Sequence, residues 1–277
     1  MTELSINRSR TPMRRLMFRL GGYAPPVVTG LLLLTLWEFA PTFFGVSPLL
    51  IPPFSSVATS LVVLISRGTI FDAIMVTGFE ALSGFTIGST LGVVVAAVIT
   101  RSRLLEQALV PYLVALQSLP KVALAPLFVV WLGFGISSKV AIATIISFFP
   151  VLINAIVGFS NIEAEKLELM RSLVASRWQT FKIVVFPNAL PFIFAGLNVA
   201  VVFSVTGALV GEFVGATRGL GTLLMQMNYN MDIAGMFSVL VVLAVMGATF
   251  HFIVRYMHRK IVFWAGPDSL EQTAPGA

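Results

Sequence analysis

Seven charged side chains lie between Asn161 and Pro191, in the one long polar segment that separates two uncharged apolar runs. They are Glu163, Glu165, Lys166, Glu168, Arg171, Arg177 and Lys182. Carboxylate and guanidinium groups make strong, charge-assisted hydrogen bonds to groups of opposite charge. The chemistry that this segment offers is therefore the recognition of another protein.

An apolar stripe runs through the same segment. Leu167, Met170 and Val174 recur at helical spacing, and Trp178 follows them. A charged loop between helices is usually just solvated, but such a loop needs no apolar stripe, and these side chains would face water without a partner. We therefore expect the segment to dock onto a second protein.

Two short helices with a turn between them are predicted to present these side chains. Ser176 and Gln179 have the spacing of a capping box, which starts the second helix. Pro187 and Pro191 are expected to end that helix and to open the next apolar run, where a missing N–H is tolerated. The segment from about residue 161 to 186 is thus predicted to be a compact helical elbow at a membrane surface.

The elbow resembles the EAA loop of the permease subunits of bacterial ABC importers. That pattern is Glu-Ala-Ala, three residues, Gly, and then a hydrophobic stretch that ends in Leu-Pro. Here Glu168 precedes Val174 by six residues, Ala175 follows, and Pro187 comes thirteen residues after Val174. The spacing is therefore similar to that of the family.

Three longer segments extend this resemblance. Residues 117–135, 175–197 and 211–221 are similar to the nitrate/sulfonate/taurine branch of the binding-protein-dependent transport family. The resemblance runs from about Leu50 to Trp264 and so covers most of the chain.

The resemblance implies partners and coupling residues. In such permeases the elbow docks into a cleft on a cytoplasmic ABC ATPase subunit and transmits its closure to the membrane helices. Carried onto this sequence, the coupling residues are Glu168, Met170, Arg171, Val174, Ala175, Ser176, Arg177 and Trp178. The family also implies an extracytoplasmic solute-binding protein, and we expect a homodimer of permease copies with the pathway between them. ATP and Mg²⁺ would be bound by the ATPase, and this chain is expected to hold no cofactor.

Two positions depart from the family pattern. Leu169 and Met170 stand where small residues are usual, and Val174 stands at the position of the glycine. Since a β-branched residue is poorly suited to positive φ, we expect the turn at Ala175 and Ser176, or a less sharp turn.

The composition indicates an integral membrane protein. Hydrophobic residues make up 57% of the 277 residues, charged residues make up 11%, and the mean hydropathy is +0.94, whereas about a quarter of an average soluble domain is charged. The net charge is +6, but the basic residues gather beside apolar runs without interleaved aromatic residues, so no nucleic-acid partner is expected. No cysteine is present, which excludes disulfides and thiolate metal sites.

Six apolar runs are long enough to cross a bilayer at about 1.5 Å per residue. The predicted spans are 20–37, 81–100, 104–132, 140–159, 183–211 and 233–254. A signal peptide competes for the first run, but that run lacks an obvious small-residue cleavage site and continues into more apolar chain. The predicted fold class is an all-α integral membrane protein with six transmembrane helices and the elbow between the fourth and fifth.

The basic residues predict the topology. Fourteen lie on the side of the elbow, and three, Arg67, Lys139 and Arg218, lie on the other side. By the positive-inside rule the elbow and both termini are cytoplasmic. The predicted organisation is a basic arm (1–19), one permease domain (20–264) and a polar tail (265–277), in the bacterial inner membrane.

Small residues recur every four positions along two of the predicted spans. The two sets are Gly84, Gly88 and Gly92, and Gly207, Gly211 and Gly215. Each set falls on one helix face, where another helix can approach closely.

Two charged residues are candidates for the pathway or its gate. Lys121 lies within the third span, where an ammonium costs at least about 2.5 kcal/mol, so it faces the pathway and favours an anionic solute, pairs with Glu38 or Glu80, or reaches an interface. Glu212 lies at the external end of the fifth span and Arg218 in the loop beyond. These two form a gate at the mouth, form a structural ion pair, or lie at the lipid interface.

Signatures of catalysis and of metal binding are missing from the sequence. None of the five lysines follows a glycine, so there is no P-loop, and neither an HExxH nor a GxSxG motif occurs. His251 and His258 lie on one helix face without a third ligand, so no metal site is expected. We expect no catalytic residue, and the energy for transport must come from a partner or from an ion gradient.

The favoured interpretation is the permease subunit of an ATP-driven importer that forms the pathway for a small solute. By resemblance the solute is an anion such as a sulfonate, taurine or nitrate, although members of this branch also carry neutral aromatic or pyrimidine compounds. The alternative is a secondary transporter driven by protons or sodium, which predicts inverted repeats and paired intramembrane acids as ion sites. The sequence shows no internal repeat, and the acids near the membrane are Glu38, Glu80 and Glu212. A membrane scaffold that transports nothing is a further alternative.

Overall fold

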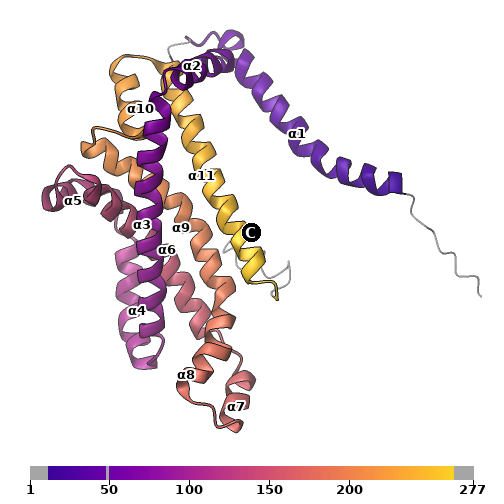
Figure 1. The fold of residues 1–277 in the computed structure, drawn as a ribbon, viewed down its shortest axis with the longest axis vertical. Helices are drawn as coiled ribbons and strands as arrows, with labels where there is room; N and C mark the ends of the chain where they lie inside the picture. Colours follow the sequence, from indigo (N-terminus) through magenta and orange to yellow (C-terminus); the bar gives the residue numbers. More distant parts are fainter. Residues whose placement is uncertain (1–11, 48–49, 265–277) are drawn as a thin grey trace, which may run out of the picture.

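A computed structural model describes residues 12–47 and 50–264, and the regular elements in these ranges are helices. Figure 1 shows an elongated bundle from which one helix, α1 (Pro12–Phe43), diverges. The predicted all-α fold is confirmed. The predicted tail and the first eleven residues of the predicted basic arm lie outside the described residues.

Within the described ranges, five helical segments are long and apolar enough to cross a membrane. They are Pro25–Phe43 of α1, α3 (Thr69–Ile99), α6 (Ile136–Ser160), Arg177–Gly215, which ends in α9 (Phe186–Gly215), and α11 (Ile233–Ile261). A sixth span results if α4 (Arg103–Gln117) and the segment Lys121–Leu132 cross together, although they meet at an angle of 82°. The six predicted apolar runs correspond to these elements.

The bend after α4 lies beside two prolines within the predicted third span. Pro120 precedes a 3₁₀ turn (Lys121–Leu124), and α5 (Ala125–Leu132) begins next to Pro126. Proline lacks the N–H that continues a helix but is tolerated in a first turn. The sequence therefore stops one helix here and starts another in a new direction.

The centre of the bundle is a stack of α3, α6 and α9 in which glycines let the backbones meet. A Cβ added at Gly88 of α3 would lie 2.6 Å from the carbonyl oxygen of Thr144, and one added at Gly207 of α9 would lie 2.7 Å from the Cα of Ala143. Both neighbours belong to α6. The backbone of α6 is thus in close contact with α3 on one side and with α9 on the other.

The diverging helix α1 is tied to α2 (Phe54–Ser66). Trp37 Nε1 donates a hydrogen bond to the Pro52 carbonyl oxygen at 3.1 Å, and the Glu38 carboxylate accepts the backbone N–H and the hydroxyl of Ser55, both at 2.8 Å. A carboxylate at this position satisfies a free N–H at the start of a helix and complements its dipole. Only 6% of the apolar window of α1 is buried, so this link positions a helix that otherwise presents apolar surface.

A short helix that the sequence did not lead us to expect, α10 (Leu220–Tyr229), connects α9 to α11. It lies at the upper end of the bundle in Figure 1, whereas α7 (Ala164–Ser172) and α8 (Arg177–Thr180) lie at the lower end. The two ends of the bundle thus carry different accessory structures.

Candidate functional site

The polar segment folds into α7 and α8 with a turn between them, and we use the term elbow for residues 161–186. The predicted capping box is confirmed: the Gln179 N–H donates to Ser176 Oγ at 3.3 Å, and the Ser176 N–H donates to Gln179 Oε1 at 2.7 Å. Where the elbow joins the bundle, Asn188 Nδ2 donates to the Asn161 carbonyl oxygen at 2.9 Å. Hydrogen bonds therefore fix the elbow both at its tip and at its base.

The turn of the elbow is made by Val174 itself, which adopts a φ of 54°. The Ala175 N–H donates to the Met170 carbonyl oxygen at 3.0 Å, and the Val174 N–H donates to that of Arg171 at 2.9 Å. This is the Schellman pattern, which usually ends on glycine. The expectation that the turn moves to Ala175 and Ser176, or is less sharp, is wrong. The strain at such a residue is roughly 1–3 kcal/mol, and the surrounding hydrogen bonds offset it.

The exposed apolar surface of the elbow differs from the predicted stripe. Met170 is only 7% exposed and Leu167 is half-buried, so neither presents much free surface. The large apolar side chains that do face outward are Leu169 (59% exposed), Leu173 (66%), Val174 (90%) and Trp178 (70%). Leu169 and Leu173 were not part of the predicted stripe, although their spacing of four residues is itself a helical signal. We call these four residues the elbow patch.

Charged side chains surround the elbow patch. Glu168, Arg171 and Arg177 are exposed. Among the described residues, the one ion pair within the elbow joins Lys166 to Glu163 at 2.8 Å. The elbow therefore presents apolar side chains and unpaired charges side by side.

The elbow continues into α9 through a π-helical turn, Phe181–Val185. Residues 177–215 form one helical segment of 39 residues, in which the Phe186 N–H donates to the Phe181 carbonyl oxygen. Pro187 falls in the first turn of α9, where its missing N–H breaks no hydrogen bond. The expectation that Pro187 and Pro191 end the second helix is wrong, because the helix continues past Pro187 through the π-helical turn. The helix that begins at Arg177 in the elbow therefore continues without a break into α9.

Lys121 lies at the bend between α4 and α5. Its Nζ donates to the Gln117 carbonyl oxygen at 2.7 Å and lies 4.8 Å from the centre of the Phe149 ring, which is a cation–π distance. Glu38 caps α2 instead of pairing with Lys121. Within the described part of the chain Lys121 has no ion-pair partner, and the hydrogen bond to Gln117 uses one of the three N–H donors of its ammonium.

Glu212 belongs to a buried polar cluster at the end of the bundle opposite the elbow. Glu212 and Glu80 are each 2% exposed, and Lys139 is 1% exposed. Glu212 Oε1 accepts the hydroxyl of Thr77 at 2.5 Å, and Oε2 accepts the N–H of Gly221 at 2.5 Å. The sequence placed Glu80, Lys139 and Glu212 near the ends of apolar runs but gave no sign that they meet.

Lys139 provides the positive charge of this cluster. Its Nζ donates to the carbonyl oxygens of Phe134 and Gly215, both at 2.5 Å. It thereby joins the turn before α6 to the last residue of α9, where a cation also complements the helix dipole. Arg218, by contrast, is exposed and lies 3.9 Å from Asp72, so the ion pair between Glu212 and Arg218 does not form.

The two sets of small residues face neighbouring elements. Gly84, Gly88 and Gly92 face α6 from α3, Gly207 and Gly211 face α6 from α9, and Gly215 faces Phe134. A Cβ added at Gly211 would lie 3.0 Å from the Cα of Lys139. These close approaches bring Lys139 within reach of its two carbonyl acceptors.

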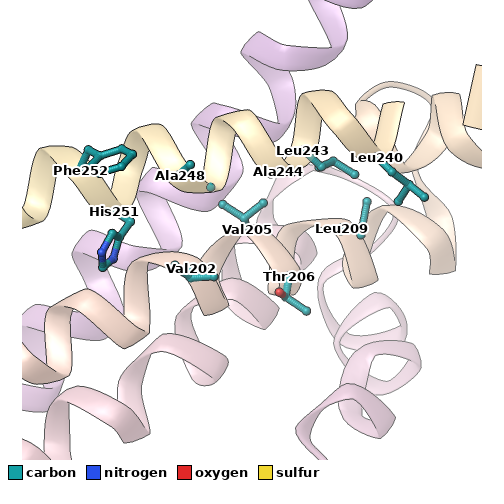
Figure 2. Close-up of a pocket in the computed structure, with 11 residues that line it drawn as sticks. Val202, Val205, Thr206, Leu209, Leu240, Leu243, Ala244, Ala248, His251 and Phe252 are labelled. Atoms are coloured by element: carbon teal, nitrogen blue, oxygen red, sulfur yellow. The ribbon is translucent and has the colours of Figure 1, made fainter. Parts of the chain in front are cut away.

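An open groove of about 440 Å³ lies between α9 and α11 (Figure 2). Apart from Thr206 and His251, apolar side chains line it, whereas solute sites use several convergent polar groups. His258, on the same helix as His251, is buried and stacks on Phe194 with 4.9 Å between ring centres. No group of three metal-ligating side chains occurs among the described residues. The groove therefore lacks the chemistry of a polar solute or metal site.

Comparison with known proteins gives the family. The profile of the family described as "Binding-protein-dependent transport system inner membrane component" matches residues 88–263. The riboflavin transport system permease protein RibX of Chloroflexus aurantiacus is 35% identical over 237 residues, which cover 86% of this chain and 88% of that protein. The formylaminopyrimidine transport permease protein ThiX of Halalkalibacterium halodurans is 30% identical, with coverage of 86% and 95%. The putative aliphatic sulfonates transport permease protein SsuC of Bacillus subtilis is 27% identical, with coverage of 88% for each chain.

Solved structures show the same fold. A chain of the MetNI methionine ABC transporter in an inward facing conformation superposes with a TM-score of 0.57 at 22% identity, over 72% of this chain and 96% of that one. A chain of an amino acid ABC transporter, solved with histidines, gives a TM-score of 0.58 at 17% identity, with the same coverage. The family match covers more than half of the sequence, and the relatives are permease components of ABC transporters. This chain therefore belongs to the family of binding-protein-dependent transport system inner membrane components.

Proposed function

We propose that this chain forms the membrane pathway of an ATP-driven importer and that its elbow receives the motion of a separate ABC ATPase subunit. Membership of the permease family supports the importer role. In this proposal ATP and Mg²⁺ bind to the ATPase, an extracytoplasmic binding protein delivers the solute, and this chain supplies only the pathway and its coupling surface.

The observation that carries the proposal is the elbow patch on its hydrogen-bonded support. Leu173 and Val174 are 66% and 90% exposed beside a turn that two backbone hydrogen bonds hold. Exposed apolar clusters with a polar rim mark protein interfaces. Because α8 runs into α9, and α9 packs against α6 at Gly207, a force on this patch would reach the centre of the bundle.

The distribution of basic residues supports a cytoplasmic position for the elbow and for both termini. The exposure of α4 supports a second permease copy. None of its residues is buried, and its large side chains Leu104 and Tyr112 are 76% and 71% exposed. In this arrangement the pathway runs between two copies, and Lys121 faces it from the bend after α4.

For the solute we propose a small anion such as a sulfonate, taurine or nitrate, which the Lys121 ammonium would attract. A flat heteroaromatic solute is the second candidate, because the relatives at 35% and 30% identity are named for riboflavin and formylaminopyrimidine. A thermal-shift screen of the binding protein that serves this permease separates the two. Stabilisation by taurine, alkanesulfonates or nitrate supports the anion, and stabilisation by riboflavin or formylaminopyrimidine alone contradicts it.

The coupling role is tested by the affinity of the purified permease for its ABC ATPase subunit. Leu173→Asp and Trp178→Asp are each expected to weaken binding about tenfold or more, as for the central residues of an interface. Glu168→Lys is expected to weaken it as well. The matched control is Tyr229→Asp, since Tyr229 is 78% exposed at the opposite end of the bundle. Wild-type affinity in both patch variants would contradict the coupling role.

A further inference from the structure

The hydrogen bonds around Glu212 have directions that the structure fixes. Thr77 Oγ1 accepts the Leu220 N–H at 2.8 Å, so the hydroxyl proton of Thr77 is left to point at Glu212 Oε1, which lies 2.5 Å away. Glu212 Oε2 faces another donor, the N–H of Gly221. A carboxylate whose two oxygens both face donors acts as an acceptor only, which is the ionised form.

Glu80 must then be the donor to Glu212. The two carboxyl groups lie within hydrogen-bond reach of each other, and such a bond requires one proton between them. Since Glu212 accepts at both oxygens, the proton belongs to Glu80. The second oxygen of Glu80 then has no donor to bond. In agreement, Glu80 Oε2 is the one buried carboxyl oxygen without a hydrogen-bond partner among the described residues. A neutral acid tolerates this position far better than a carboxylate does.

With this proton the cluster is electrically neutral. Lys139 interacts electrostatically with both carboxyl groups and carries one positive charge, Glu212 carries one negative charge, and Glu80 carries none. Buried charges persist when they are balanced and hydrogen-bonded. Lys139 meets the second condition through its bonds to Phe134 and Gly215.

The cluster also holds the start of α10. Leu220 and Gly221 are the first two residues of this helix, whose N–H groups have no partner within the helix. Gly219 has a φ of 120°, and a Cβ added at Gly221 would lie 2.8 Å from Glu212 Oε2. The Gly-Leu-Gly sequence therefore lets the backbone close around the carboxylate, whose charge also complements the helix dipole.

We propose that Glu80, Glu212, Lys139 and Thr77 form a charge-neutral latch, in which Glu80 carries the only carboxyl proton and Glu212 fastens the first turn of α10 to α3 and α9. These are positioning residues for transport: while the elbow drives α9, the latch keeps α10 moving with the spans as one body. The joint movement of α10 with the spans rests on the proposed function. The proton on Glu80 and the attachment of α10 by Glu212 do not.

The proton on Glu80 is tested by infrared spectroscopy of the purified permease in lipid nanodiscs at neutral pH. A protonated carboxyl group has a C=O stretching band separate from that of a carboxylate. The latch predicts such a band in the wild type, its loss in Glu80→Gln, and its retention in Glu168→Gln, which changes an exposed acid. A spectrum that Glu80→Gln leaves unchanged overturns the assignment.

The fastening is tested by the distance between two spin labels. The chain contains no cysteine, so single cysteines at Phe71 of α3 and Tyr229 of α10, which are 57% and 78% exposed, give one defined pair within each permease copy. Mixing labelled with excess unlabelled permease removes the distances between copies. In the assembled importer the latch predicts the same narrow distance distribution without nucleotide and in an ATP-trapped state. Measurement on the permease alone still reports on the fastening if the elbow fails to bind an ATPase.

The variants give the latch an asymmetric signature. Glu80→Gln still donates an N–H to Glu212 and is expected to keep the narrow distribution. Glu212→Gln turns an NH₂ group toward a donor, and Thr77→Val, which is nearly isosteric, removes two hydrogen bonds, so both are expected to broaden it. If Glu80→Gln broadens it as much as Glu212→Gln does, Glu80 is an ionised partner of Lys139 and the latch is wrong. Narrow distributions in both Glu212→Gln and Thr77→Val also overturn it.

Discussion

The carbonyl oxygen of Thr144 on α6 occupies the space that a side chain at Gly88 of α3 would need: an added Cβ at position 88 would lie 2.6 Å from it. No side chain separates the two helices at this point. Helix association in a bilayer depends on such van der Waals packing, because lipid offers little hydrophobic drive.

Gly88→Ala is therefore expected to destabilise the permease. The new methyl group meets backbone rather than a flexible side chain, and overpacking of this kind costs about 1–3 kcal/mol. The matched control is Gly247→Ala in α11, a buried glycine with nothing within 4 Å of an added Cβ. Thermal unfolding in detergent should show a lower Tm for Gly88→Ala and an equal or higher Tm for Gly247→Ala. Equal loss in both would show that the contact with Thr144 does not matter.

Both this contact and the spans that make it were predictable from local patterns. A repeat of Gly84, Gly88 and Gly92 places small residues on one helix face whatever the rest of the chain does. The capping box at Ser176 and Gln179 was readable for the same reason, because its bonds join residues three positions apart.

The turn at Val174 illustrates where local preference is overruled. Sequence reasoning gave weight to the cost of positive φ for a β-branched residue, but two Schellman hydrogen bonds outweigh that cost. The buried polar cluster around Glu212 was not predicted from the sequence, for another reason. Thr77 and Glu212 are 135 positions apart, and no local pattern records such a contact.

Val174→Gly is expected to make the elbow more stable. Glycine removes the strain at φ 54°, which is roughly 1–3 kcal/mol, and this exceeds the extra backbone entropy of about 0.5–1 kcal/mol. Hydrogen exchange of the Ala175 amide, which is bonded to Met170, should slow. Ala175→Gly, at a position without positive φ, should instead speed exchange across the elbow. Faster exchange in Val174→Gly would show that the turn is unstrained.

Ser176→Ala is expected to loosen α8. It removes the side-chain acceptor of the Gln179 N–H, and the loss of such a cap costs about 1 kcal/mol. Amide exchange at Gln179 should become several-fold faster, and Ser176→Asp, which keeps an acceptor, should restore most of the protection. No change in Ser176→Ala would mean that the capping box contributes nothing to the fold of the elbow.

Glu38→Ala is expected to release α1 from α2. The variant removes the acceptor for both the N–H and the hydroxyl of Ser55, and the loss of a cap of this type costs about 0.5–2 kcal/mol. Limited proteolysis should cut faster between Phe43 and Phe54. Glu106→Ala provides the control, since Glu106 binds Ser160 in another part of the bundle. Unchanged cleavage in Glu38→Ala would contradict the role of this link.

The claim that the elbow grips an ATPase is tested most directly by a photo-crosslinking amino acid at Leu173 in the assembled importer. The account predicts a crosslink from position 173 to the ATPase subunit, identified by mass spectrometry, and none to that subunit from position 229 at the other end of the bundle. A crosslink to the ATPase from position 229, or none from position 173 in an active importer, would contradict it.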